Sequence, residues 1–124
     1  MFNGIEHFAI ASADPKGLAG WYTSNLEFQL LFESGGNYFV QAKNGAVIEI
    51  TPAEGARPDS GMHTPGMRHM AISVDNFDAA YEHLKASGIQ FAGEPYTNNR
   101  NRLVFFRDGD GNLVHLIERE RPLF

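Results

Sequence analysis

The chain has 124 residues, enough for one ordinary domain or for two very small modules that share a core. It has no cysteine, which excludes disulfides and thiol catalysis and leaves histidine nitrogen and carboxylate oxygen as the metal ligands. The net charge of −5 argues against a nucleic-acid partner, and no apolar run approaches the ~20 residues of a membrane span. Because the start lacks a signal-peptide pattern, a cytoplasmic protein is expected.

A short sequence motif occurs twice. Residues 5–10 read Ile-Glu-His-Phe-Ala-Ile, and residues 67–72 read Met-Arg-His-Met-Ala-Ile. His7 and His69 are therefore 62 residues apart, which is half the chain length. This spacing predicts a duplicated module.

The first half predicts the element order βαβββ. A helix is expected from Pro15 to about Asn25, because Asp14 can cap it and proline suits its first position. Turns are expected at the glycine pair 35–36 and at Asn44-Gly45. The alternating or apolar runs predict strands over residues 5–11, 28–34, 38–42 and 46–51.

The second half repeats that order. A helix is expected from Asp75 or Asn76 to about Ser87, with Gly88 just past its end. Strands are expected over residues 67–74, 89–92, 102–107 and 113–118. Residues 52–66, with three prolines and three glycines, read as a linker. The sequence thus predicts one domain, 1–124, with module 1 over about 1–51 and module 2 over about 67–124.

The first strand of each module carries a histidine on the face with the smaller side chains. Strand side chains alternate between faces, so His7 lies with two alanines and His69 lies with Ala71 and Ser73. The bulkier opposite faces are expected to meet the helices. A polar group beside small side chains leaves a hollow that suits a ligand.

The last strand of each module carries a titratable side chain in an apolar run. Glu49 and His115 each need a partner, water or a metal, because burying such a group alone costs several kcal/mol. Glu49 follows His7 by 42 residues, and His115 follows His69 by 46. A pseudo-twofold arrangement of the modules would bring all four side chains together.

Four motifs in this order resemble the glyoxalase I / bleomycin-resistance / extradiol-dioxygenase superfamily, the vicinal oxygen chelate fold. They are His7-Phe-Ala-Ile, Val47-Ile-Glu-Ile, His69-Met-Ala-Ile-Ser-Val-Asp and Asp108-Gly-Asp-Gly-Asn-Leu-Val-His-Leu-Ile-Glu. The resemblance implies an α+β fold in which two βαβββ modules form a cupped, mostly antiparallel sheet with the helices outside. It also implies a divalent metal in the cup, with two positions open for adjacent substrate oxygens.

The resemblance implies four metal ligands, His7, Glu49, His69 and His115. Metal-using relatives usually have glutamate at the last position, so His115 is a departure. Glu118 lies three residues further on, hence on the opposite strand face. Glu49 is then the only carboxylate of the set and is assigned as the proton-transfer base, and a neutral His115 could also move protons near pH 7.

The expected function is a glyoxalase-like enzyme that isomerises, epimerises or cleaves a small oxygenated substrate by proton transfer. Two alternatives stay open, a drug-binding protein of the bleomycin-resistance kind and an Fe(II) dioxygenase. The metal could be nickel, cobalt, manganese, iron or zinc. Arg100 and Arg102 either belong to a solvated rim or hold a substrate carboxylate or phosphate. A homodimer is expected, with no nucleic-acid or membrane partner.

Overall fold

The computed structural model describes all residues, 1–124, as two compact units, Met1–Arg57 and Pro58–Phe124. The boundary between the units falls inside the proline- and glycine-rich segment 52–66. Each unit holds one helix and one four-stranded mixed sheet, so the predicted α+β class with two βαβββ modules is confirmed. Neither helix has the length and apolar character needed to cross a bilayer.

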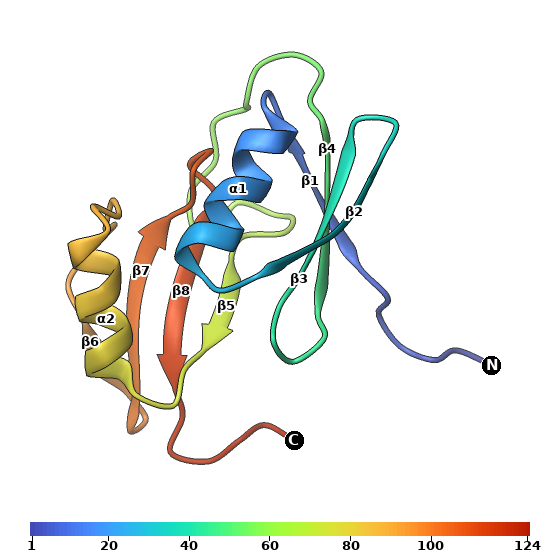
Figure 1. The fold of residues 1–124 in the computed structure, drawn as a ribbon. Coiled ribbons are helices and arrows are strands. Elements are labelled where there is room, and N and C mark those ends of the chain that lie inside the picture. Colours follow the sequence, from blue (N-terminus) through green and yellow to red (C-terminus); the bar gives the residue numbers. More distant parts are fainter. The chain divides into compact units, whose positions relative to one another are not determined.

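Unit 1 begins with strand β1 (Phe8–Ser12) and helix α1 (Pro15–Asn25). Strands β2 (Gln29–Ser34), β3 (Asn37–Gln41) and β4 (Val47–Pro52) follow. The sheet order is β1-β4-β3-β2, in which β1 runs parallel to β4 and the other pairs are antiparallel (Figure 1). Asp14 caps α1 by accepting a hydrogen bond from the backbone N–H of Gly17, at 3.0 Å, as its side chain predicted.

Unit 2 repeats this topology with β5 (Met70–Ser73) and α2 (Phe77–Ala86). Strands β6 (Tyr96–Asn98), β7 (Asn101–Arg107) and β8 (Leu113–Glu118) complete the sheet, in the order β5-β8-β7-β6 (Figure 1). Here β5 runs parallel to β8. Asn76, one of the two predicted caps, accepts from the N–H of Ala79 at 3.1 Å.

One predicted strand is displaced. Residues 89–92 were expected to form the second strand of module 2, but the strand there is β6, at Tyr96–Asn98. Residues 90–92 still meet β7, through the isolated bridge between Phe91 and Phe106 and a backbone hydrogen bond from Ala92 to Phe105. Gly93 and Pro95 follow at once, and a proline cannot donate to a strand ladder, so pairing stops and resumes beyond it.

The bulky strand faces pack against the helices, as the alternation predicted. In β1 and β5 the side chains of Phe8, Ile10, Met70 and Ile72 are half-buried, whereas Ala9, Ala11, Ala71 and Ser73 are exposed. The buried apolar core of unit 1 consists of Leu18, Ala19, Tyr22, Phe28, Val40, Ile48 and Ile50. In unit 2 it consists of Phe77, Leu84, Leu103, Val104, Phe106, Val114, Leu116 and Ile117. In β1 and β5 the face that carries the histidine is therefore the more exposed one.

The two helices end in the same backbone conformation but with different residues. Gly88 is the residue after the C-cap of α2 and has a φ of 74°. Glu27 is the residue after the C-cap of α1 and has a φ of 60°. A left-handed φ suits glycine because a Cβ is crowded there. Nothing lies within 4 Å of where a Cβ on Gly88 would sit, so the backbone angle alone sets the cost of a side chain.

We expect Glu27→Gly to stabilise the protein by about 0.5–1 kcal/mol, because it removes a side chain from a left-handed position. The reciprocal variant Gly88→Ala should destabilise the protein by a similar amount. Urea unfolding of both variants beside the wild type measures the two shifts. Equal stability of Glu27→Gly and the wild type would contradict this account.

Candidate metal centre

A row of side chains crosses the sheet of unit 1 on its small-residue face. The strand register places Ala9 beside Glu49, Glu49 beside Phe39, and Phe39 beside Phe32. His7 lies just before β1 and two residues before Ala9. The pairing of β1 with β4 therefore brings the predicted ligands of module 1 to the same place.

The side chains of His7 and Glu49 meet directly. Nε2 of His7 lies 3.5 Å from Oε1 of Glu49, and both side chains are partly buried, with 35% and 20% of their surface exposed. Two ligands bound at about 2.1 Å to one metal stand roughly 3.0–3.4 Å apart, depending on the angle between them. The observed spacing is close to that range, so this pair fits two neighbouring positions on a divalent ion.

Each of these two groups has a further partner on its other side. Nδ1 of His7 lies 2.8 Å from Oε1 of Glu6, and Nδ2 of Asn37 donates to Oε2 of Glu49 at 3.4 Å. A carboxylate on Nδ1 favours the imidazole tautomer whose Nε2 lone pair is free for a metal. Sequence reasoning did not single out Glu6 or Asn37, because both contacts depend on side-chain placement.

Unit 2 builds the matching pair. The register places Ala71 beside His115 and His115 beside Phe105, and His69 lies just before β5. The ring centres of His69 and His115 are 4.9 Å apart. Two imidazoles on one metal would have ring centres roughly 4.6–5.3 Å apart for bond lengths of about 2.1 Å. The second pair therefore also fits neighbouring positions on a metal.

The ring of His115 is held in a defined tautomer. Its Nδ1 lies 3.0 Å from the backbone carbonyl oxygen of Leu116, which can only accept, so Nδ1 carries the proton and Nε2 is left as the free nitrogen. Burial lowers the pKa of His115 below 6.5, and the charges of His69 and Arg119 lower it further, against the opposing effect of the bond to Leu116. A neutral imidazole with a free Nε2 is the form that binds metals.

An aromatic ring flanks each histidine. Phe39 lies edge-on to His7 with ring centres 6.1 Å apart, and Phe105 lies edge-on to His69 at 5.6 Å. Phe39 also stacks on Phe32, at 4.4 Å. Phe39 of β3 and Phe105 and Phe106 of β7 differ in the face on which they lie. Phe106 is fully buried core, whereas the other two belong to the histidine faces.

The four predicted ligands are thus gathered as two pairs, one in each unit. Neither unit by itself holds a group of three or more His, Asp or Glu side chains placed to bind a metal. Glu118 points elsewhere, because its Oε1 accepts from the N–H of Phe77 at 2.8 Å and caps α2.

The two arginines considered for substrate binding carry surface contacts. Arg100 pairs with Glu120 at 3.2 Å, and Arg102 pairs with Asp78 at 2.7 Å while lying over the Phe77 ring. Arg100 also lies in the tight turn between β6 and β7, at φ of 66°. Their role toward a substrate stays a prediction.

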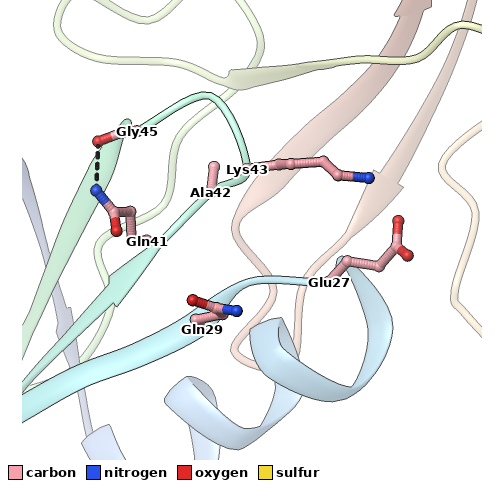
Figure 2. Close-up of a pocket in the computed structure, with 6 residues that line it drawn as sticks. All are labelled: Glu27, Gln29, Gln41, Ala42, Lys43 and Gly45. Atoms are coloured by element: carbon pink, nitrogen blue, oxygen red, sulfur yellow. Dashed lines mark hydrogen bonds between the residues drawn. The ribbon is translucent and has the colours of Figure 1, made fainter.

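An open polar hollow of about 360 Å³ lies elsewhere in unit 1, between the end of α1 and the β3–β4 turn (Figure 2). It is lined by Glu27, Gln29, Gln41, Ala42, Lys43 and Gly45. The side-chain amide of Gln41 donates to the carbonyl of Gly45 at 3.2 Å, as Figure 2 shows. None of the four predicted ligands lines this hollow.

Comparison with known proteins places these features in a family. The model of the Glyoxalase/Bleomycin resistance protein/Dioxygenase superfamily matches residues 4–116. The chain belongs to this superfamily. The matched range includes His7, Glu49, His69 and His115, and the match confirms the family predicted from the four motifs.

Relatives cover the same length as this chain. The uncharacterised protein YaeR of Escherichia coli K12 is 31% identical, over 93% of this chain and 95% of its own. A glyoxalase family protein from Enterococcus faecalis has a solved structure with a TM-score of 0.76 at 25% identity, covering 94% and 98% of the two chains. The antibiotic-binding protein TnmS3 from Streptomyces sp. CB03234 has a TM-score of 0.76 at 20% identity, covering 96% and 98%. The last likeness shows the shared fold alone.

The lowered pKa of His115 predicts how stability depends on pH in metal-free protein. Above pH 6.5 its stabilising contribution is complete, and it is lost as the pH falls toward the folded-state pKa, because the unfolded chain then binds the proton more readily. The loss should be at most about 1.4 kcal/mol between pH 6.5 and 5.5. Urea unfolding at pH 7.5 and 5.5, with chelator present, measures it.

The matched control for this measurement is the exposed His83 on α2. His115→Leu should reduce the difference in unfolding free energy between the two pH values, whereas His83→Gln should leave it unchanged. An unaltered difference in His115→Leu would show that another group is responsible.

Proposed function

We propose that the protein is a metal-dependent enzyme of the glyoxalase type, in which His7, Glu49, His69 and His115 together hold one divalent ion. The four ligands would come from one chain or from the two chains of a homodimer. The observation that carries the proposal is that each unit brings two candidate ligands together at equivalent points of the repeat. Nε2 of His7 lies 3.5 Å from Glu49, and the ring centres of His69 and His115 are 4.9 Å apart. A random placement of polar side chains would not recur at matching register positions in both sheets.

The donor set suits several metals. Imidazole and carboxylate donors accept nickel, cobalt, manganese, iron or zinc, and availability decides among them as much as affinity. A bound divalent ion would supply Lewis-acid stabilisation to a substrate that offers two neighbouring oxygens. The substrate would be a small oxygenated molecule that undergoes isomerisation, epimerisation or lyase-type proton transfer.

Glu49 is the residue proposed to move the proton. It is the only carboxylate among the four donors, and it is partly buried, with Oε1 toward His7 and Oε2 held by Asn37. A carboxylate next to the reacting carbon accepts a proton in the forward direction and can return it to another atom of the substrate. His115 was the other residue predicted to move protons, but with its Nδ1 bonded to Leu116 and its Nε2 on the ion it would have no free nitrogen and would act as a ligand alone.

Metal titration tests the ligand set. Wild-type protein freed of metal should take up one equivalent of Ni²⁺, Co²⁺ or Zn²⁺ per chain. His7→Ala, His69→Ala and His115→Ala should each weaken binding by about a hundredfold or more, because each removes a ligand that the rest of the site cannot replace. Isothermal titration calorimetry measures the affinity, and His83→Ala and His63→Ala, which change histidines outside the set, are the controls.

Uptake of less than about 0.2 equivalents of every metal tested would overturn the proposed function, because protein sites built from four such donors bind far more tightly. Retained tight binding of a bulky apolar ligand by metal-free His69→Ala would instead favour a role as a binding protein, the activity named for TnmS3. Oxygen uptake with catechols would favour a dioxygenase.

The assignment of Glu49 as the base leads to a separate prediction. Metal-loaded wild-type protein should exchange the carbon-bound hydrogen of a small hydroxycarbonyl compound with deuterium from D₂O, when a panel of such compounds is followed by NMR. Glu49→Gln removes the base and should slow this exchange by about 10²–10⁴-fold. A Glu49→Gln protein that binds metal and exchanges at the wild-type rate would contradict the assignment to Glu49.

A further inference from the structure

Asn37 is a polar side chain beside the proposed base that the ligand set does not include. It is the first residue of β3, it is partly buried, and its Nδ2 donates to Oε2 of Glu49 at 3.4 Å. The other carboxylate oxygen, Oε1, lies 3.5 Å from Nε2 of His7. The two oxygens of Glu49 therefore have different partners, one polar amide and one imidazole.

The strand register explains why Asn37 reaches Glu49. Phe39 lies directly opposite Glu49 on the neighbouring strand, and Asn37 lies two residues before Phe39, hence on the same face. Diagonal neighbours of this kind stand about 7–8 Å apart at the backbone, within reach of two polar side chains that extend toward each other. The contact is therefore built into the pairing of β3 with β4.

A tight turn fixes the position of Asn37. Gly35 and Gly36 form a two-residue connection between β2 and β3, with φ of 59° and 88°, and Ser34 pairs with Asn37 across it. Two positive φ angles are typical of a type I′ turn, whose twist matches that of the flanking strands. The amide of Asn37 thus lies on a rigid hairpin. A rigid element is a suitable place for a group that orients a neighbouring side chain.

The duplicated unit lacks this donor. The residue two positions before Phe105, which matches Asn37 in the repeat, is Leu103, and it is buried and apolar. The ligand beside it is His115, whose ring is oriented by the carbonyl of Leu116. Of the two last-strand ligands, only the carboxylate of Glu49 therefore has an amide donor beside it, and this donor can restrict the rotation of the carboxylate. The imidazole of His115 is already oriented by a backbone carbonyl and needs no such donor.

We propose that Asn37 is a positioning residue for Glu49. By holding Oε2, it fixes the rotation of the carboxylate and keeps Oε1 directed to the side of His7. This inference rests on the proposed function for its role in metal binding and proton transfer, whereas the contact itself belongs to the fold of unit 1. Groups that hydrogen-bond a metal ligand from outside the coordination sphere typically change affinity by 10–100-fold, and the long 3.4 Å contact points to the lower end.

The test compares Asn37→Ala, Glu49→Ala and the double variant with the wild type. Asn37→Ala should weaken Ni²⁺ or Co²⁺ binding about tenfold, and it should cause no further loss when Glu49 is already alanine. The matched control is Gln41→Ala, which removes an amide from the same face of β3 whose bond goes to Gly45 instead. That control should leave metal affinity unchanged within about twofold. Asn37→Gln keeps the donor on a longer stem and should recover part of the affinity.

A second measurement works without metal. Urea unfolding midpoints of the same four proteins, with chelator present, form a double-mutant cycle. The double variant should lose less stability than the two single variants together, because both remove the same contact. Strictly additive midpoints, or an Asn37→Ala protein with wild-type metal affinity, would overturn the positioning role.

The two measurements also separate this inference from the proposed function. If wild-type protein binds no metal, the proposed function fails, and the unfolding cycle alone decides whether Asn37 holds Glu49. If wild-type protein binds metal and the effect of Asn37→Ala persists in the Glu49→Ala background, the ligand set survives and the positioning role of Asn37 fails.

Discussion

The parallel pairing of the first and last strand of each module is the constraint on which the rest of the structure depends. It aligns Ala9 with Glu49 in unit 1 and Ala71 with His115 in unit 2, and so brings residues that are 40 and 44 positions apart in the sequence to adjacent places. Parallel neighbours cannot be joined by a tight turn and need a long crossover. In both modules a helix and two further strands form this connection. The helix covers the bulky face of the sheet, and the small-residue face keeps its histidine.

The two modules use one backbone plan with different chemistry at its key positions. Unit 1 pairs an imidazole with a carboxylate, whereas unit 2 pairs two imidazoles. The surroundings follow this difference. Glu49 is partly exposed and has an amide donor beside it, while His115 is buried, uncharged near neutral pH and oriented by a backbone carbonyl. A buried carboxylate in the second position would have needed a donor that Leu103 cannot supply.

Several charged side chains of the motifs and helix ends make structural contacts. Glu118 caps α2, Asp14 caps α1, and Asp108 is buried in the β7–β8 turn, where Oδ1 accepts from the N–H groups of Asp110 and Asn112. Arg102 covers the ring of Phe77 and pairs with Asp78 at the start of α2. These contacts satisfy helix and turn groups that would otherwise lack partners.

The sequence by itself determined the duplicated βαβββ order, the helix caps and which strand face carries each histidine, because these depend on local periodicity, turn residues and a visible repeat. It misplaced β6, since Phe91 retains one bridge to β7 while Gly93 and Pro95 delay the strand. Only the tertiary structure decided that Glu49 meets His7, that Phe39 and Phe105 flank the histidines and that Asn37 reaches Glu49. Those contacts depend on strand register and side-chain rotation, and alternation along a single strand carries no information on either.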